Sequence, residues 1–129
     1  MDEIRLGLVG ETKLVVTEQV TAAAYYSGLV PAFATPVMVG LMENASVAAM
    51  QKHLPAGHTS VGIEICIKHL AATPIGMNVR ARAEVTRIEG RRVMFKVEAW
   101  DDKEKIGEGT HQRMIVDEAR FSERIKQKK

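Results

Sequence analysis

Three residues in apolar surroundings carry polar side chains that could take part in proton transfer: Glu43, His69 and Thr35. Glu43 lies within a strongly apolar stretch, where a carboxylate needs polar partners. His69 ends an alternating segment on its apolar side, and an imidazole changes charge near neutral pH. Thr35 adds a hydroxyl. Carboxylates and imidazoles in such settings recur in active sites, where they act as acids and bases.

Each residue also has a structural interpretation. Glu43 could bond to a neighbouring loop, His69 could be a core histidine bonded to the backbone, and Thr35 could cap a helix. The functional interpretation depends on the three together, because a packed helix and sheet could direct them toward one crevice. Thr35 and Glu43 are eight residues apart, about 12 Å along a helix, so they cannot touch within one chain. A site shared between two subunits could bring such residues together.

A long helix is predicted for residues 35–53. Thr35 and Pro36 form a start signal, because a threonine hydroxyl can cap free N–H groups and proline suits the first helical position. Pro55 and Gly57 end the helix. Apolar residues fall on all its sides, so we expect other elements to cover it all round.

Alternating apolar and polar residues predict strands after the helix. In residues 61–69 the odd positions, ending in His69, form one inward face. Residues 79–85 and 93–99 alternate in the same way, with a hairpin turn at residues 89–90 between them. Residues 106–116 form the last strand, in which His111 and Arg113 share one face, and the pattern fits either face inward.

With a first strand at residues 12–17, this order predicts an α+β fold, an antiparallel sheet curled around one long central helix. So small a sheet leaves edge strands that a second copy would cover, so we expect a dimer. Residues 20–33, with Tyr25 and Tyr26, predict a loop that could act as a lid. Residues 119–129 predict a charged tail, either a short solvated helix or disordered.

The composition narrows the class of protein. Its 129 residues suit one domain, residues 1–129. A net charge of +2 and 5% aromatic residues argue against a nucleic-acid partner. One cysteine, Cys66, and four histidines without metal-ligand spacing predict neither an internal disulfide nor a metal site. No apolar run is long enough to cross a membrane, and we expect a cytoplasmic protein.

Four segments carry a resemblance to a known family: MVGLME at residues 38–43, ICIKH at 65–69, EGRR at 89–92 and GEGTHQR at 107–113. They resemble the fluoroacetyl-CoA thioesterase-like family of hotdog-fold thioesterases, and the likeness covers about residues 7–121. The resemblance implies a hotdog fold, a homodimer or a tetramer, and hydrolysis of a short-chain or small acyl-CoA thioester. Coenzyme A is then part of the substrate, and no other cofactor is implied.

The resemblance also assigns roles to residues. The family's catalytic threonine, glutamate and histidine correspond to Thr35, Glu43 and His69, and Gly62 and Arg113 match positions near the acyl group. This set suits acyl transfer, since a thioester needs an attacking oxygen, a proton acceptor and donors to the developing oxyanion. Either the threonine hydroxyl or the carboxylate could form a covalent acyl intermediate.

Two departures from the family bear on the acyl group. Residues 25–29 are YYSGL where the family enzyme has a phenylalanine-rich lid, and Asn44 stands where it has a tryptophan. A generic short-chain or small aryl acyl-CoA is therefore expected as much as fluoroacetyl-CoA. Two other functions share the scaffold: a non-catalytic acyl-CoA binder, and an enoyl-CoA hydratase, whose usual Asp/His pair on the central helix is missing.

Overall fold

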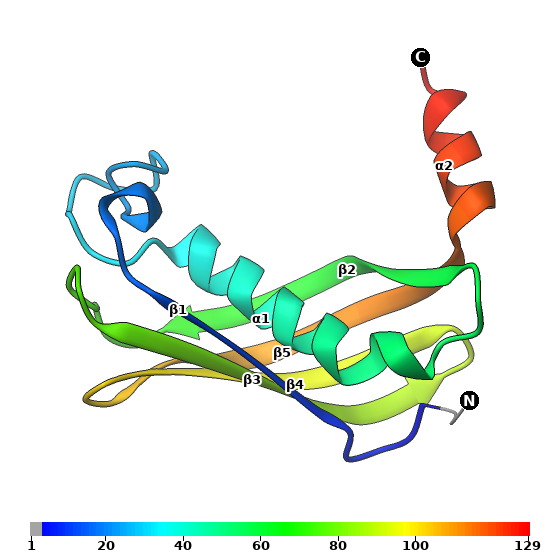
Figure 1. Ribbon diagram of the computed structural model, residues 1–129, viewed down its shortest axis with the longest axis horizontal. Coiled ribbons are helices and arrows are strands. Elements are labelled where there is room, and N and C mark those ends of the chain that lie inside the picture. The colour runs from blue at the N-terminus through cyan, green and yellow to red at the C-terminus, as the bar shows by residue number, and fades with distance from the viewer. Residues whose placement is uncertain (1–3) are drawn as a thin grey trace.

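The computed structural model describes residues 4–129, in which a five-stranded antiparallel sheet curls around one side of a long helix (Figure 1). The strands are β1 (Val9–Val15), β2 (His58–His69), β3 (Asn78–Glu89), β4 (Arg92–Asp101) and β5 (Lys105–Asp117). The central helix α1 (Thr35–Met50) continues into a 3-10 turn, η2 (Gln51–His53), and helix α2 (Glu118–Lys126) follows β5. The order β1-β3-β4-β5-β2 leaves β1 and β2 at the edges. The predicted α+β fold is confirmed.

The core lies between α1 and the inner face of the sheet. The inward residues of β3 and β4 alternate as the sequence predicts, and all are buried: Val79, Ala81, Ala83, Val85, Val93, Phe95, Val97 and Ala99. From α1, Met38, Met42 and Ala45 pack against them. The predicted hairpin turn joins the two strands at Gly90, whose φ of 60° is left-handed.

One side of α1 is exposed, which corrects the expectation that the helix would be covered all round. The exposed stripe consists of Thr35, Pro36, Gly40, Asn44 and Ala48. From Pro36 onward these residues repeat every four positions, the spacing of one helix face. The sheet curls around the opposite side only, so this chain by itself leaves one side of α1 uncovered.

A β-bulge in β2 interrupts the alternation predicted for residues 61–69. The register against β5 shifts just after Gly62, so that Ile63 is the extra residue, and it is 47% exposed. Before the bulge the even positions Ser60 and Gly62 face α1; after it the odd positions face α1, as far as His69. The prediction of one continuous inward face was therefore wrong for Val61 and Ile63.

From Gly107 to Arg113, strand β5 presents its odd positions to the inside, and Ile106, at the register shift against β4, is also buried in the core. His111 and Arg113 are both buried there. Each is paired with an inward residue of β2, because His111 lies opposite Ile65 and Arg113 opposite Gly62. The tertiary structure thus decides between the two faces that the sequence left open.

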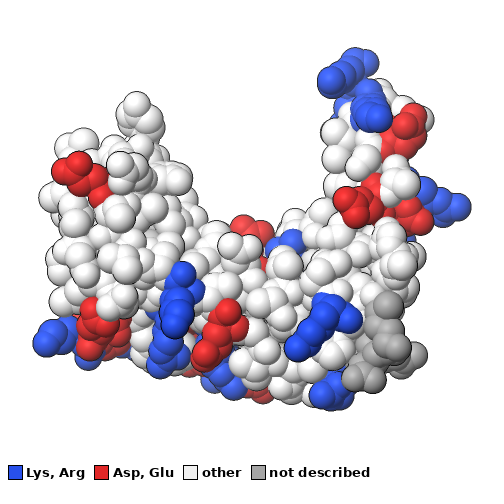
Figure 2. Space-filling model, viewed as in Figure 1, with Lys and Arg blue, Asp and Glu red and all other residues white. Residues whose placement is uncertain are grey.

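Two segments extend beyond the β2 edge, one at each end of the strand (Figure 1). The first is the loop arm, residues 18–34, which begins with the turn η1 (Glu18–Val20) and is held by the bridges Thr21↔Phe33 and Ala32↔Pro74. The second is α2. Figure 2 shows a hollow between the two projections. The predicted loop and the predicted short helix are both present. Within residues 4–129, no helix has the length and apolar character needed to cross a membrane.

Gly10 allows β1 to lie directly on α1. A Cβ there would stand 2.1 Å from the Ala45 carbonyl oxygen and 2.4 Å from the Ala49 nitrogen. Both are backbone atoms, so they cannot avoid the clash by a change of side-chain rotamer. We expect Gly10→Ala to lower the free energy of unfolding by about 3 kcal/mol through overpacking. The matched control is Gly40→Ala in α1, where a Cβ meets nothing within 4 Å and the change should raise stability by up to about 1 kcal/mol. Urea unfolding measures both, and equal effects would contradict the close approach.

Candidate active site

Thr35 and His69 form a hydrogen-bonded pair where the start of α1 meets the end of β2. Thr35 Oγ1 lies 2.7 Å from His69 Nδ1. The expected capping role of Thr35 is not observed, because Ala34 is the N-cap residue and makes no side-chain cap bond. Thr35 is instead the first helical residue, and its hydroxyl is directed at the imidazole. A hydroxyl bonded to a base in this way is the arrangement found in activated nucleophiles.

The His69 imidazole is suited to accept a proton at neutral pH. Burial lowers its pKa, because a charged ring is less well solvated there, and the backbone of Ala71 opposes the shift. The ring is therefore neutral at pH 7. Its Nε2 is buried and has no hydrogen-bond partner among residues 4–129. One ring nitrogen is thus bonded to Thr35, while the other has no partner in the described part of the chain.

A cavity of about 390 Å³ opens beside this pair. Its lining consists of Phe33, Thr35, His69, Leu70, Ala71 and Ala72. Apart from the hydroxyl and the imidazole, these side chains are apolar. The cavity has the size and the mixture of apolar walls and few polar groups that are typical of small-molecule sites.

A second polar cluster lies further along α1 and is organised by Arg113. Its Nη1 donates to Glu43 Oε2 at 3.3 Å, its Nε donates to Ser60 Oγ at 2.8 Å, and its Nη2 donates to the Ser60 carbonyl at 3.0 Å. The Arg113 side chain is 8% exposed and that of Glu43 is 40% exposed. Burial lowers the pKa of Arg113, and the Glu43 carboxylate opposes this shift. The buried guanidinium thus holds a carboxylate that still reaches solvent.

The bulge in β2 places Gly62 in the same cluster. A Cβ at this position would stand 2.6 Å from Glu43 Oε2 and 3.4 Å from Arg113 Nη1. Glycine therefore leaves the room that the carboxylate occupies. Glu43, Gly62 and Arg113, which sequence reasoning named from three different segments, lie together in the folded chain.

His111 completes the cluster in a single neutral tautomer. Its Nδ1 lies 2.7 Å from the Glu64 carbonyl and must donate, whereas Nε2 lies 3.2 Å from Arg113 Nη1 and must accept. Burial lowers the pKa of His111; the Glu64 carbonyl opposes this shift and the Arg113 charge adds to it. Sequence reasoning noticed His111 beside Arg113 but missed Ser60, because the inward position of Ser60 depends on the bulge.

The two clusters are separate within one chain. Thr35 and Glu43 are eight residues apart on α1, about 12 Å. Among residues 4–129, the hydrogen-bond partner of the Glu43 carboxylate is Arg113, and that of the His69 ring is Thr35. The fold therefore brings Thr35 to His69, and Glu43 to Gly62 and Arg113, without joining the two groups.

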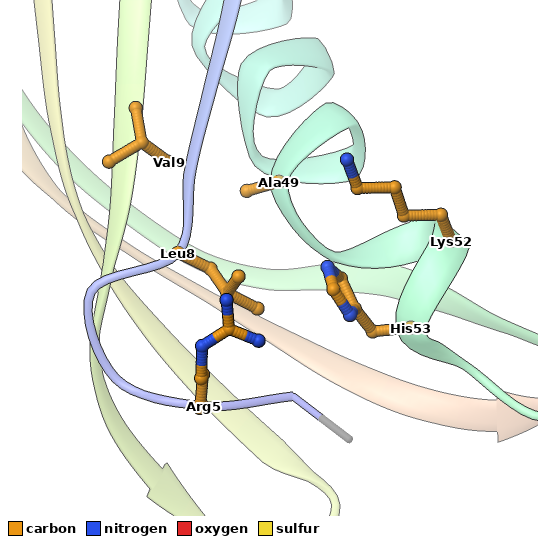
Figure 3. A pocket seen from close by; sticks show the side chains of 6 residues that line it. All are labelled: Arg5, Leu8, Val9, Ala49, Lys52 and His53. Carbon is orange, nitrogen blue, oxygen red and sulfur yellow. The ribbon is translucent and has the colours of Figure 1, made fainter. Parts of the chain in front are cut away.

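A larger cavity, of about 440 Å³, lies at the other end of α1 (Figure 3). It is lined by Arg5, Leu8, Val9, Ala49, Lys52 and His53. Ala49 is fourteen residues from Thr35, about 21 Å along the helix, so this cavity is not part of the Thr35–His69 site. In the part of the chain that the structure describes, no group of three or more histidine, cysteine, aspartate or glutamate side chains could hold a metal ion.

A curled antiparallel sheet around one long helix is the hotdog fold, and the solved structures that this chain resembles are hotdog-fold thioesterases. The family model described as "Fluoroacetyl-CoA-specific thioesterase" matches residues 16–119. The chain belongs to this family, and it is therefore a thioester hydrolase.

Individual relatives agree with this assignment. The fluoroacetyl-CoA thioesterase of Streptantibioticus cattleyicolor is 46% identical over 96 residues, which are 74% of this chain and 69% of the relative. The crystal structure of a variant fluoroacetyl-CoA-specific thioesterase has a TM-score of 0.93 at 38% identity and covers 100% of both chains. A thioesterase superfamily member from Thermus thermophilus has a TM-score of 0.90 at 31% identity, covering 98% of this chain and 94% of its own. The hotdog fold and the family resemblance are both confirmed.

The two buried histidines predict a dependence of stability on pH. Their pKa values in the folded chain are lowered from the ordinary value of 6.5. Just below that pH the unfolded chain binds more protons than the folded chain. The free energy of unfolding should therefore be at its full value above about pH 6.5 and fall as the pH decreases below it. Chemical unfolding at a series of pH values measures this.

The variant His111→Asn separates this effect from general acid sensitivity. Asparagine keeps a donor for the Glu64 carbonyl but does not titrate, so the pH dependence should become shallower. His58→Asn, at a histidine outside both clusters, is the matched control. Identical pH dependence in the wild type and His111→Asn would contradict the assignment of a buried neutral imidazole.

Proposed function

We propose that this thioester hydrolase cleaves short-chain or small acyl-CoA esters with His69 as its general base. The hydrogen bond of 2.7 Å between Thr35 Oγ1 and His69 Nδ1, at the wall of an apolar cavity, carries the proposal. A neutral imidazole has one accepting nitrogen: Nδ1 when Thr35 donates to it and is the attacking group, or the unpartnered Nε2 when Nδ1 donates to Thr35 and water is the attacking group.

The proposed chemistry transfers an acyl group from sulfur to oxygen. His69 accepts a proton as an oxygen, from Thr35 or from water, attacks the thioester carbonyl carbon. The tetrahedral intermediate then collapses, the C–S bond breaks, and the proton passes from His69 to the sulfur of coenzyme A. Attack by water releases the acid directly. Attack by Thr35 leaves an ester on the threonine, which water hydrolyses in a second step, so the mass of the protein during turnover distinguishes the two routes.

We place the rest of the site in a second subunit. β2 is an edge strand of 12 residues, and Ile63 within it and Leu70 after it are exposed apolar residues. Antiparallel pairing of β2 with its own copy would continue the sheet and cover them. A two-fold axis near Cys66 places Gly62 close to the partner's His69, because both residues are three or four positions from the axis. We therefore propose a homodimer, and not a tetramer, as the smallest complete unit.

In this dimer the Glu43 carboxylate faces the partner's thioester site. Arg113 holds the carboxylate in place, and Gly62 leaves the room that the carboxylate occupies, so we propose that the acyl group lies next to these residues. Glu43 then acts in catalysis beside the partner's His69, as a second proton acceptor. A glutamyl anhydride detected by mass would instead assign Glu43 as the nucleophile. Thr35, Glu43 and His69 are the proposed catalytic set, and Gly62 and Arg113 the proposed substrate-binding residues.

The proposed acyl group is small. The Streptantibioticus cattleyicolor relative is named a fluoroacetyl-CoA thioesterase, and structures of similar enzymes were solved with fluoroacetate and CoA and with acetyl-CoA. In this chain Tyr25 and Tyr26 belong to the loop arm, and Asn44 follows Glu43 on α1. We propose that acetyl-CoA and propionyl-CoA are hydrolysed at least as well as fluoroacetyl-CoA. Coenzyme A arrives as part of the substrate, and no further cofactor is proposed.

Replacing His69 tests the proposed base. We expect His69→Ala to lower kcat/KM for acetyl-CoA by about 100-fold or more, the usual effect of removing a general base. Release of free thiol measures the rate, across acetyl-, propionyl- and fluoroacetyl-CoA. Thr35→Ser keeps the hydroxyl and should stay within about tenfold of the wild type, and His58→Ala should match the wild type. An unchanged rate in His69→Ala removes His69 from the mechanism, and tight binding without turnover by the wild type would indicate a non-catalytic binder.

Cys66 tests the proposed subunit pairing without any substitution. It is the one cysteine of the sequence, and it is exposed on β2. A two-fold axis near Cys66 brings the two thiols within reach of a short bismaleimide, so we expect a cross-linked dimer that is absent from Cys66→Ser. Light scattering should give the mass of two chains for both. A one-chain mass with no cross-link would overturn the dimer.

An unpaired surface thiol also suits the reducing cytoplasm, the location we propose.

A further inference from the structure

We propose that α2 of each subunit packs on the partner's loop arm and closes the partner's Thr35–His69 cavity. This inference rests on the dimer proposed above. It adds an interaction surface, and it makes the C-terminal helix of one subunit part of the substrate enclosure of the other.

The first observation is that α2 lacks a packing surface in its own chain. It projects away from the sheet (Figure 1), and none of its residues is fully buried. Phe121 and Ile125 are four positions apart, so they lie on the same side of the helix, and Ile125 is 54% exposed. An isolated helix of nine residues is marginal in water, and an apolar side normally stabilises it by packing against another element.

The second observation is a matching apolar surface at the tip of the loop arm. Tyr26 is 96% exposed, Leu29 95% and Val30 61%. Tyr26 also has a left-handed φ of 55°, the one positive value for a non-glycine residue in the part of the chain that the structure describes. Such a conformation costs about 1 kcal/mol for a bulky side chain. Exposed apolar side chains grouped in this way mark an interaction site.

The third argument is that the two-fold axis proposed above would bring these two surfaces together. α2 leaves the sheet after Asp117, which is paired with His58 at the start of β2. The loop arm is attached beyond the other end of β2, through the bridge Ala32↔Pro74. His58 lies eight positions before Cys66 and Pro74 lies eight after it. A rotation about an axis near Cys66 therefore exchanges the two ends and places the base of α2 opposite the base of the partner's loop arm.

The shape of the molecule agrees with this exchange. The loop arm and α2 both extend past the β2 edge, and the hollow between them in Figure 2 is where a second β2 would lie. Each projection then reaches over the partner instead of into solvent. The interface continues from the β2 pairing, so the second copy is the occupant that the geometry selects.

Charge is complementary across the same contact. Residues 18–34 contain one charged residue, Glu18, and no lysine or arginine. Residues 118–129 contain five lysines and arginines and two glutamates. A net positive C-terminal segment therefore meets a loop arm with one negative charge, which favours this contact over pairing of α2 with another α2.

The contact acts on the site because the loop arm ends at the cavity. Phe33 lines the cavity beside Thr35, and the Phe33 backbone N–H donates to the Thr73 carbonyl. When the partner's α2 rests on the loop arm, the cavity loses its open side, and water is excluded from the thioester. Retention of a small acyl group then depends on Phe121 and Ile125 of the partner subunit.

A cross-link between differently substituted chains tests the contact. In a Cys66→Ser background, chains with Leu29→Cys are mixed with separately tagged chains with Ile125→Cys and treated with a short bismaleimide. We expect a cross-linked heterodimer. The matched control pairs Leu29→Cys with Glu123→Cys, which lies two positions from Ile125 and therefore on the opposite side of α2, and it should give little product. Absence of the Leu29–Ile125 product while Cys66 still cross-links wild-type chains would overturn this inference and leave the dimer standing.

Kinetics test the effect on the site. Phe121 lies on α2, which has no buried residue, so Phe121→Asp should leave folding and the two-chain mass intact. We expect KM for acetyl-CoA to rise by roughly fivefold or more, with a smaller change in kcat, because closure is weakened and His69 is untouched. Ser122→Asp carries the same charge on another side of α2 and should match the wild type. Equal KM values in Phe121→Asp and the wild type would overturn the role in closure, whereas a one-chain mass for the wild type would overturn the dimer as well.

Discussion

One extra residue in β2 determines where the functional side chains lie. The bulge at Ile63 reverses which positions of β2 face α1, so that Ser60 and Gly62 face inward on one side of it and His69 faces inward on the other. Without it, a strict alternation could direct Gly62 or His69 toward α1, but not both. Both polar clusters therefore depend on this one bulge in an edge strand, because it allows Gly62 and His69 to face α1 at the same time.

The two buried imidazoles show how similar burial leads to different chemistry. His111 uses both ring nitrogens, one toward the Glu64 carbonyl and one toward Arg113, so it is fixed as a structural acceptor. His69 is bonded at Nδ1 only, to Thr35, and its Nε2 lacks a partner among residues 4–129. Burial lowers the pKa of both residues. A lowered pKa alone would not separate them; the difference is that both ring nitrogens of His111 are engaged, whereas one ring nitrogen of His69 has no partner in the described part of the chain.

Much of the fold could be predicted from local pattern. The period of two in β3 and β4, the glycine turn between them and the long apolar helix after Thr35 are all local signals, and each element formed close to its expected bounds. The errors also have local causes. Thr35 looks like a cap because a hydroxyl precedes a proline, but a nearby imidazole offers that hydroxyl another partner. The complete burial expected of α1 failed because apolar content does not say how many chains cover a helix.

The sequence by itself determined the elements, their order and the residue types available for chemistry, because periodicity, turn residues and family segments are properties of neighbouring positions. Tertiary structure alone decided which residues meet: Arg113 with Glu43 across 70 positions, Thr35 with His69 across 34, and Ser60 in a role that no pattern indicated. The physical reason is that a bulge and a strand register are set by packing over the whole sheet. A bulge or a shift of register changes which side of the sheet every later residue of the strand faces, but it leaves the local pattern of apolar and polar residues almost unaltered.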